Sequence, residues 1–135
     1  MKITDLMVGD LVKTNPSCGK LANNIKSTIG IVSEIGYLPS DGYYIIIAGH
    51  KEKYYDDEVE PIQMTDEILD KNGFKKNNFN RYVLGESNLM EEIYYELGWI
   101  QLRYPNSYYC ISTCEYVHEF QHSLKMFKIE KEIVI

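Results

Sequence analysis

Two histidines and a glutamate near the carboxyl-terminal end of the chain have a spacing that suits metal chemistry. The segment His118-Glu119-Phe120-Gln121-His122 is an H-E-x-x-H sequence. Histidines four residues apart on a helix project from the same face, so both imidazoles can reach one zinc ion. Glu119 would then be the general base for a zinc-bound water, whose pKa the metal lowers to roughly 7. This interpretation predicts a zinc-dependent hydrolase with His118 and His122 as ligands.

The residues that follow the motif favour a different interpretation. A catalytic zinc ion requires a third protein ligand. The extended form of the motif has a glycine and a third histidine at positions that Lys125 and Lys128 occupy here. We therefore expect a non-enzymatic protein without a cofactor, and we keep the zinc hydrolase as the alternative.

The helix expected to carry the motif also has an apolar stripe that would pack on a core. His118 and His122 lie at the border of this stripe, and Glu119 lies on the opposite face. Histidines in such border positions are commonly packing residues. The stripe consists of Val117, Phe120, Leu124 and Phe127.

Tyrosine is the second residue type that suggests a function. The chain has twelve tyrosines, and two adjacent pairs, Tyr43-Tyr44 and Tyr54-Tyr55, fall on predicted strands of the first half. Successive strand residues point to opposite faces, so one ring of each pair can enter the core while the other stays outside. Exposed tyrosine rings are rigid contact surfaces for proteins or peptides. The alternative is that all four tyrosines simply fill half-buried sheet positions.

Charge and composition narrow the range of partners. The net charge is −6, and acidic residues outnumber basic residues in both halves of the chain. Nucleic-acid binding requires a concentrated basic surface, so we do not expect it. No apolar run approaches the roughly 20 residues of a membrane-spanning helix. The acidic residues Asp5 and Asp10 interrupt the first apolar stretch, which predicts no signal peptide and a cytoplasmic protein with reduced cysteines.

Short strands separated by turns are predicted in residues 1–62. Apolar runs at 6–12, 28–35, 43–48 and 53–59 alternate with segments rich in glycine, proline and aspartate. This spacing is typical of a small barrel or a curled sheet. The run V-G-D-L-V, followed by G-I-V and then E-V-E-P-I, resembles the strand order of SH3-like small β-barrels.

A mixed unit is predicted in residues 63–135, beyond a boundary at Pro61. Thr65 is a good N-cap for a short helix over 65–71, and a longer helix is predicted over 114–128. Strands are expected between the two helices, although the pattern over 89–97 fits a helix as well as a strand. Alternating isoleucines predict a closing strand over 129–135.

Three segments of the chain also carry a family resemblance. Y-D-D-E-V-E-P-I at 55–62, T-D-E-I-L-D-K-N-G-F at 65–74 and Y-V-H-E-F-Q-H at 116–122 are similar to a family of small proteins of gut-associated bacteria and their mobile elements. The resemblance implies an α+β fold and no particular activity or substrate. We expect an N-terminal SH3-like barrel packed against a C-terminal antiparallel sheet with two helices, working as a protein-interaction or accessory module.

Overall fold

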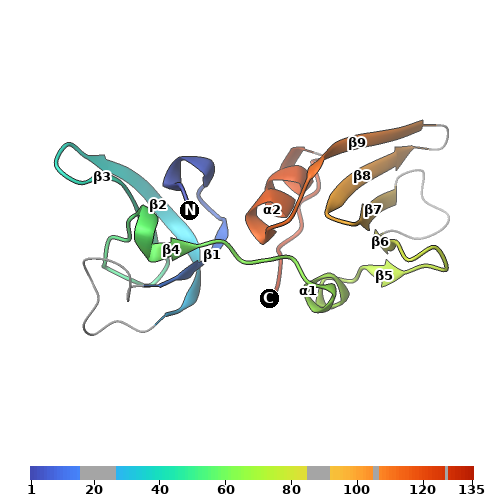
Figure 1. Ribbon diagram of the computed structural model, residues 1–135, viewed down its shortest axis with the longest axis horizontal. Helices are drawn as coiled ribbons and strands as arrows, with labels where there is room; N and C mark the ends of the chain where they lie inside the picture. Colours follow the sequence, from blue (N-terminus) through green and yellow to red (C-terminus); the bar gives the residue numbers. More distant parts are fainter. Residues whose placement is uncertain (16–26, 85–91, 105–106, 127) are drawn as a thin grey trace. The chain divides into compact units, whose positions relative to one another are not determined.

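The chain divides into two compact units, Met1–Ile62 and Gln63–Ile135. The computed structural model describes residues 1–15, 27–84, 92–104, 107–126 and 128–135. Each unit has its own antiparallel sheet, and the α-helices of the described residues both belong to the second unit (Figure 1). The fold is therefore mixed α/β. Neither described helix has the length and apolar character that crossing a bilayer requires.

Four antiparallel strands form the sheet of the first unit in the order β3-β2-β1-β4. Their bounds are β1 (Leu11–Thr14), β2 (Ile29–Leu38), β3 (Gly42–Ile47) and β4 (Val59–Glu60). Two 3-10 turns, η1 (Ile3–Asp5) and η3 (Asp56–Glu58), flank the sheet. The sheet does not close in the described residues, so the predicted SH3-like barrel is not confirmed. The core consists of Ile3, Leu6, Val12, Val32, Ile45, Ile47, Tyr54 and Val59.

The first strand begins later than the apolar run at 6–12 predicts. Gly9 has a φ of 97°, and the Asp10 carboxylate accepts a hydrogen bond of 2.7 Å from the Met7 amide. These two features fold the apolar run into a turn, because a side-chain acceptor competes with a strand partner for the same amide. The strand β1 therefore begins only at Leu11.

The long strand β2 contains a β-bulge at Ser33. Val32 pairs with Ile47, and the next pair in the ladder is Glu34 with Ile46. Ser33 is thus the extra residue, and its hydroxyl donates to the Ile46 carbonyl at 3.0 Å. A bulge of this kind bends its strand and increases the local twist. The bend lets β2 pair with β1 at one end and with β3 at the other.

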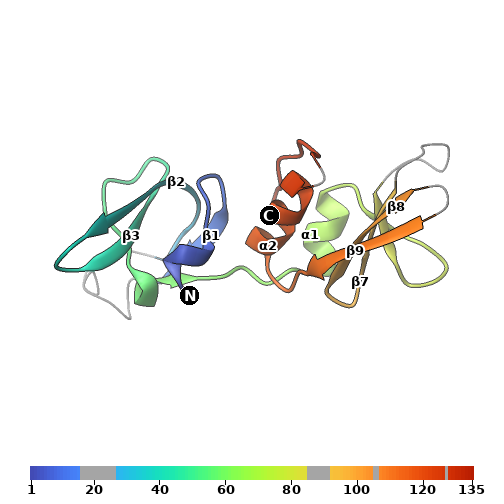
Figure 2. The ribbon, with the colours of Figure 1, turned by 90° about the horizontal axis from the view of Figure 1, so that it is seen from above.

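The second unit is a five-stranded antiparallel sheet of order β5-β6-β7-β8-β9 with two helices. Figure 2 shows both helices on the same side of this sheet. The segment 92–96, where helix and strand were both compatible with the sequence, is a strand. The bounds are α1 (Asp66–Lys71), β5 (Lys75–Lys76), β6 (Tyr82–Leu84), β7 (Glu92–Glu96), β8 (Trp99–Tyr104), β9 (Ser107–Thr113) and α2 (Val117–Met126).

The sequence predicts the start of the first helix correctly and that of the second helix incorrectly. Thr65 accepts a hydrogen bond from the Ile68 amide at 3.3 Å, and α1 starts directly after it. The predicted start of the longer helix at residue 114 is wrong. Thr113 still pairs with Trp99 in the sheet, and Tyr116 forms an isolated bridge with Gln63. The sheet therefore holds the chain extended until α2 begins at Val117.

The closing strand predicted over 129–135 is also wrong, because no residue of this segment lies in a strand. A side chain replaces the expected strand partner. The Asn72 amide group donates to the Val134 carbonyl at 2.7 Å and accepts from the Val134 amide at 2.9 Å. Since Ile133 is buried, its apolar contacts fix the segment without a strand. The isoleucine alternation thus reflects packing of a single extended segment.

Candidate binding site

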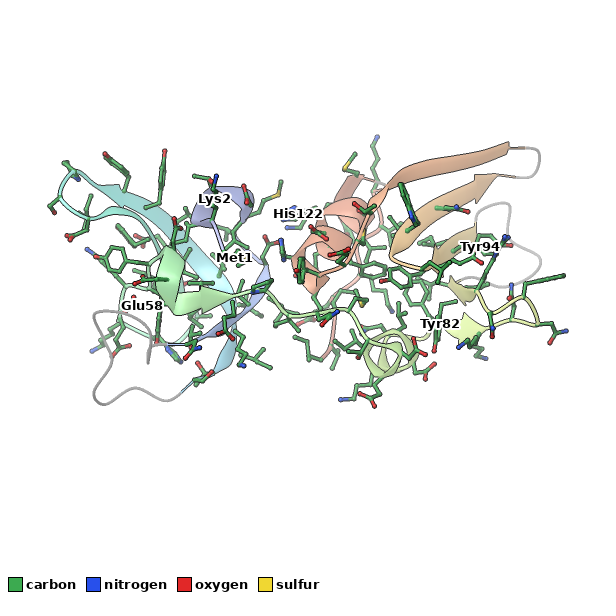
Figure 3. All side chains as sticks on the ribbon, in the orientation of Figure 1. Met1, Lys2, Glu58, Tyr82, Tyr94 and His122 are labelled. Atoms are coloured by element: carbon green, nitrogen blue, oxygen red, sulfur yellow. The ribbon has the colours of Figure 1, made fainter. Side chains whose placement is uncertain are left out.

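The histidines of the H-E-x-x-H motif lie on α2 with their rings close together. The ring centroids of His118 and His122 are 5.9 Å apart at an angle of 80°, and Figure 3 labels His122. The Tyr116 ring also stacks on His118, with centroids 5.9 Å apart and an angle of 13°. The His118 side chain is buried and His122 is half-buried. His118 therefore packs against two aromatic rings.

Glu119 stabilises the beginning of α2. Its carboxylate accepts hydrogen bonds from the backbone amides of Glu115 at 2.8 Å and Tyr116 at 3.2 Å. The amides at a helix start have no partner within the helix, and an acid at the third helical position can reach back to them. The negative charge also interacts favourably with the helix dipole. This carboxylate points to the helix start and binds backbone amides there, so it is not positioned as a general base beside the two histidines.

A third metal ligand is missing from the described part of the chain. No group of three or more histidine, cysteine, aspartate or glutamate side chains gathers there. Cys114 is buried next to Ser123, with 3.2 Å between sulfur and hydroxyl oxygen. Val117, Phe120 and Leu124 are buried as the apolar stripe predicts, and Phe127 lies outside the described residues. The arrangement supports packing, and nothing in it favours the hydrolase.

The predicted tyrosine surface is wrong for Tyr54. Its ring is fully buried in the core of the first unit, and its hydroxyl lies 2.9 Å from the His50 ring. Burial is the main cause that raises the pKa of this phenol. Tyr44 is half-buried, and the end of its ring lies over Gly36, where a Cβ would meet it. The Tyr44 hydroxyl donates to Glu34 at 3.1 Å. Neither ring is an open contact surface.

Tyr43 and Tyr55 instead meet in a groove, which we call the acidic tyrosine groove. It has a volume of about 360 Å³ and joins the β2–β3 turn to η3. Tyr43 is 49% exposed, and the Tyr37 ring lies beside it at a centroid distance of 5.1 Å. The groove is lined by Asp41, Gly42, Tyr43, Tyr55, Asp56 and Asp57.

The core positions the walls of this groove. Tyr43 continues the inward face of β3 beyond the buried residues Ile45 and Ile47, so its ring lies at the open end of the core. The buried Glu58, labelled in Figure 3, accepts a hydrogen bond from the Tyr55 amide at 3.0 Å. Asp56 accepts one from the Ile3 amide at 2.8 Å. Hydrogen bonds from backbone amides to these two carboxylates thus fix η3 at the groove.

The groove combines two features that attract cations. Among the residues that the structure describes, three carboxylates line it and no basic side chain does. Tyrosine rings add the negative face of their π-systems, which attracts ammonium and guanidinium groups. The tyrosines are predicted from the sequence and the aspartates are not, because only the fold brings Asp41 and Asp57 to the same groove. The available signal is that aspartates lie near both tyrosines in the sequence, in Asp-Gly-Tyr and in Tyr-Asp-Asp.

Comparison with protein-family models, with curated proteins and with solved structures finds no match to this chain. The geometry of the described residues therefore carries the functional argument.

Proposed function

We propose that this protein is a non-enzymatic interaction module that binds a cationic side chain of a partner protein or peptide. The binding site is the acidic tyrosine groove of the first unit. The single observation that carries this proposal is that Tyr43 and Tyr55 share one groove with three carboxylates. The charge is complementary to lysine or arginine, and the groove is formed within one unit.

Arginine fits the groove better than lysine does. Its guanidinium is planar, stacks on aromatic rings and donates paired hydrogen bonds to carboxylates. A cation over a tyrosine ring contributes about 0.5 to 2 kcal/mol, depending on how far it is desolvated. Since tyrosine has few rotatable bonds, ordering the two rings costs little entropy. We therefore propose a segment with an exposed arginine as the ligand.

Backbone contacts near the groove support an SH3-like architecture for the first unit, which we include in the proposal. Ile45 and Tyr54 exchange two backbone hydrogen bonds of 2.9 Å each. Five residues later, Val59 pairs with Thr14 of β1. The segment between Tyr54 and Val59 thus connects the β3 edge with the β1 edge. An SH3-like small barrel would have its strands curled in this way, with the groove at one end.

A titration with a minimal ligand tests the proposal. The probe is an acetylated, amidated Gly-Arg-Gly peptide, added to the full chain and followed by amide chemical shifts. We expect saturable shifts at residues 41–43 and 55–57. The same peptide with citrulline, which is neutral and similar in shape, should cause none of them. Equal binding of the two peptides, or shifts confined to other segments, would contradict the proposal.

Variants separate the contribution of the rings from that of the charge. Tyr55→Ala should weaken arginine-peptide binding roughly threefold to thirtyfold, whereas Tyr55→Phe should retain the ring contribution. Asp57→Asn should also weaken binding. Glu67→Gln is the matched control, because it removes one exposed negative charge from α1 in the other unit. If Glu67→Gln weakens binding as much as Asp57→Asn does, the attraction is a general effect of net charge.

A further inference from the structure

A second cavity lies in the other unit, where α2 ends and the last residues of the chain turn back. Its volume of about 530 Å³ is within the usual range of small-molecule sites. The argument depends on two apolar residues and four charged residues of its lining. These residues are Leu124, Lys125, Lys128, Ile129, Glu130 and Lys131.

The end of the helix forms the apolar part of the cavity. The Ile129 amide donates to the Leu124 carbonyl at 2.9 Å, and the Lys128 amide donates to the Lys125 carbonyl at 3.0 Å. This pair of bonds is the Schellman motif, which commonly brings the residues at the positions of Leu124 and Ile129 into apolar contact. Leu124 is buried, with 1% of its surface exposed, and Ile129 is half-buried. The accessible apolar surface of the helix end is therefore that of Ile129, which the turn holds in place.

Lys128 occupies a backbone conformation that normally favours glycine. Its φ is 59°, in the left-handed region, at the position where a Schellman motif most often has glycine. A side chain makes this conformation energetically costly. Non-glycine residues in such conformations cluster at ligand-binding sites. Here the conformation places a long cationic side chain on the lining of the cavity.

The charges of the lining are not balanced. Three lysines share the cavity with one carboxylate, that of Glu130. Across the described ranges, no carboxylate forms an ion pair with any of these three ammonium groups. The lysines partly offset the negative end of the α2 dipole. The remaining positive charge lies next to an apolar surface, in a protein whose net charge is −6.

We infer from this arrangement that the cavity at the end of α2 binds an amphiphilic anion, with an apolar body on Ile129 and an anionic head between the lysines. A fatty-acid carboxylate and an aromatic sulfonate both belong to this class. The site is independent of the acidic tyrosine groove, because all of its residues belong to the other unit.

Fluorescence titration of the full chain with 8-anilinonaphthalene-1-sulfonate tests this inference. We expect saturable binding of one dye per chain, with amide shifts at residues 121–131 and with an affinity that falls as salt increases. Dodecanoate should displace the dye, whereas sulfate and dodecanol, which each lack one half of the ligand, should not. Displacement by sulfate alone, or fluorescence that does not saturate, would overturn the inference.

Lys128→Gly is the most informative variant, because it removes a charge and relieves the backbone at the same time. We expect this variant to unfold at a higher temperature and to bind the dye at least about fivefold more weakly. Lys128→Arg should retain binding. Lys71→Gln, which removes a lysine from the last turn of α1, is the matched control and should bind like the parent. Unchanged binding in Lys128→Gly and in Lys131→Gln would show that the lysines only stabilise the helix end.

Discussion

Three carboxylates in this chain share one local role at the scale of single residues. Each accepts a hydrogen bond from the backbone amide three residues before it, at 2.7 to 3.2 Å. An acid in this position satisfies an amide that a turn or a helix start would leave without a partner. Acidic residues that suggest surface charge or catalysis in the sequence are therefore part of the fold. The acids are Asp10, Glu58 and Glu119, and their donors are Met7, Tyr55 and Tyr116.

Replacing Glu119 tests the capping role directly. Glu119→Ala should lower the free energy of unfolding by about 1 kcal/mol, because the amides of Glu115 and Tyr116 lose their acceptor. Denaturant unfolding measures this change. Glu132→Ala, an exposed acid beyond the helix, is the control and should leave stability nearly unchanged. An unaltered unfolding curve for Glu119→Ala, together with stoichiometric zinc in the untagged parent, would favour the hydrolase.

Stability at alkaline pH should depend on Tyr95. Its hydroxyl donates to the Cys114 carbonyl at 2.9 Å, and burial is the main cause that raises the pKa of this phenol to about 12. The unfolded phenol has a pKa of about 10, so the folded state favours the protonated form. This contribution is fully present below pH about 10 and is lost as the pH rises through about 12.

Denaturant midpoints measured from pH about 9 to about 12 check this prediction, and the midpoint of the parent should fall over that range. Tyr95→Phe should show a smaller fall, since it has no proton to lose. Tyr82, whose pKa burial also raises to about 12, provides a second variant, Tyr82→Phe. Identical pH profiles for the parent and both variants would contradict the prediction.

At the scale of elements, one asparagine connects α1 to the last residues of the chain. The buried Asn72 amide group bonds the Val134 backbone twice and also donates to the Ile68 carbonyl at 2.7 Å. We expect Asn72→Ala to lower the free energy of unfolding by roughly 2 kcal/mol and to speed hydrogen exchange at Val134. Asn78→Ala, at an exposed asparagine, is the control. Exchange at Val134 that stays slow in Asn72→Ala would contradict this role.

Elements with strong local signals were predictable from the sequence. The strand β3 is an apolar run between glycine turns, and α1 follows the capping residue Thr65. The errors occur where a contact distant in the sequence decides the structure. Thr113 stays in the sheet because of Trp99, and residues 129–135 do not form a strand because Asn72 takes the place of one. No local pattern contains this information.

The same distinction applies to the candidate site. Tyr43 and Tyr55 could be selected from their adjacent pairs, since strand alternation places one member of a pair outside. Which tyrosine of a pair is buried depends on where the core ends, and the sequence does not show this. Tyr54 is buried in the second pair, and Tyr43 is exposed in the first pair. The contribution of Asp41 and Asp57 requires η3 to lie next to the β2–β3 turn, which is a tertiary contact.

At the scale of the whole molecule, the core cluster around Ile45 lies entirely within the first unit, and the second unit has buried apolar residues of its own, such as Phe120. A substitution that removes side-chain volume from that core should therefore lower the stability of one unit only. Ile45→Ala should destabilise residues 1–62 by about 2 to 5 kcal/mol, while hydrogen exchange in α1 and α2 stays at the parent rate. Phe120→Ala should give the reverse pattern. Equal loss of protection in both units after either substitution would show that they unfold together.

The β-bulge of β2 has a consequence for variation in chain length. Val32 and Ile35 both face inward although they are three residues apart, because Ser33 adds one residue to the outward side. Loss of either Ser33 or Glu34 would restore strict alternation and leave every later side chain on its present face, whereas loss of Val32 would move Ser33 to the buried position. Single-residue deletions should therefore be tolerated at positions 33 and 34 and disfavoured at position 32.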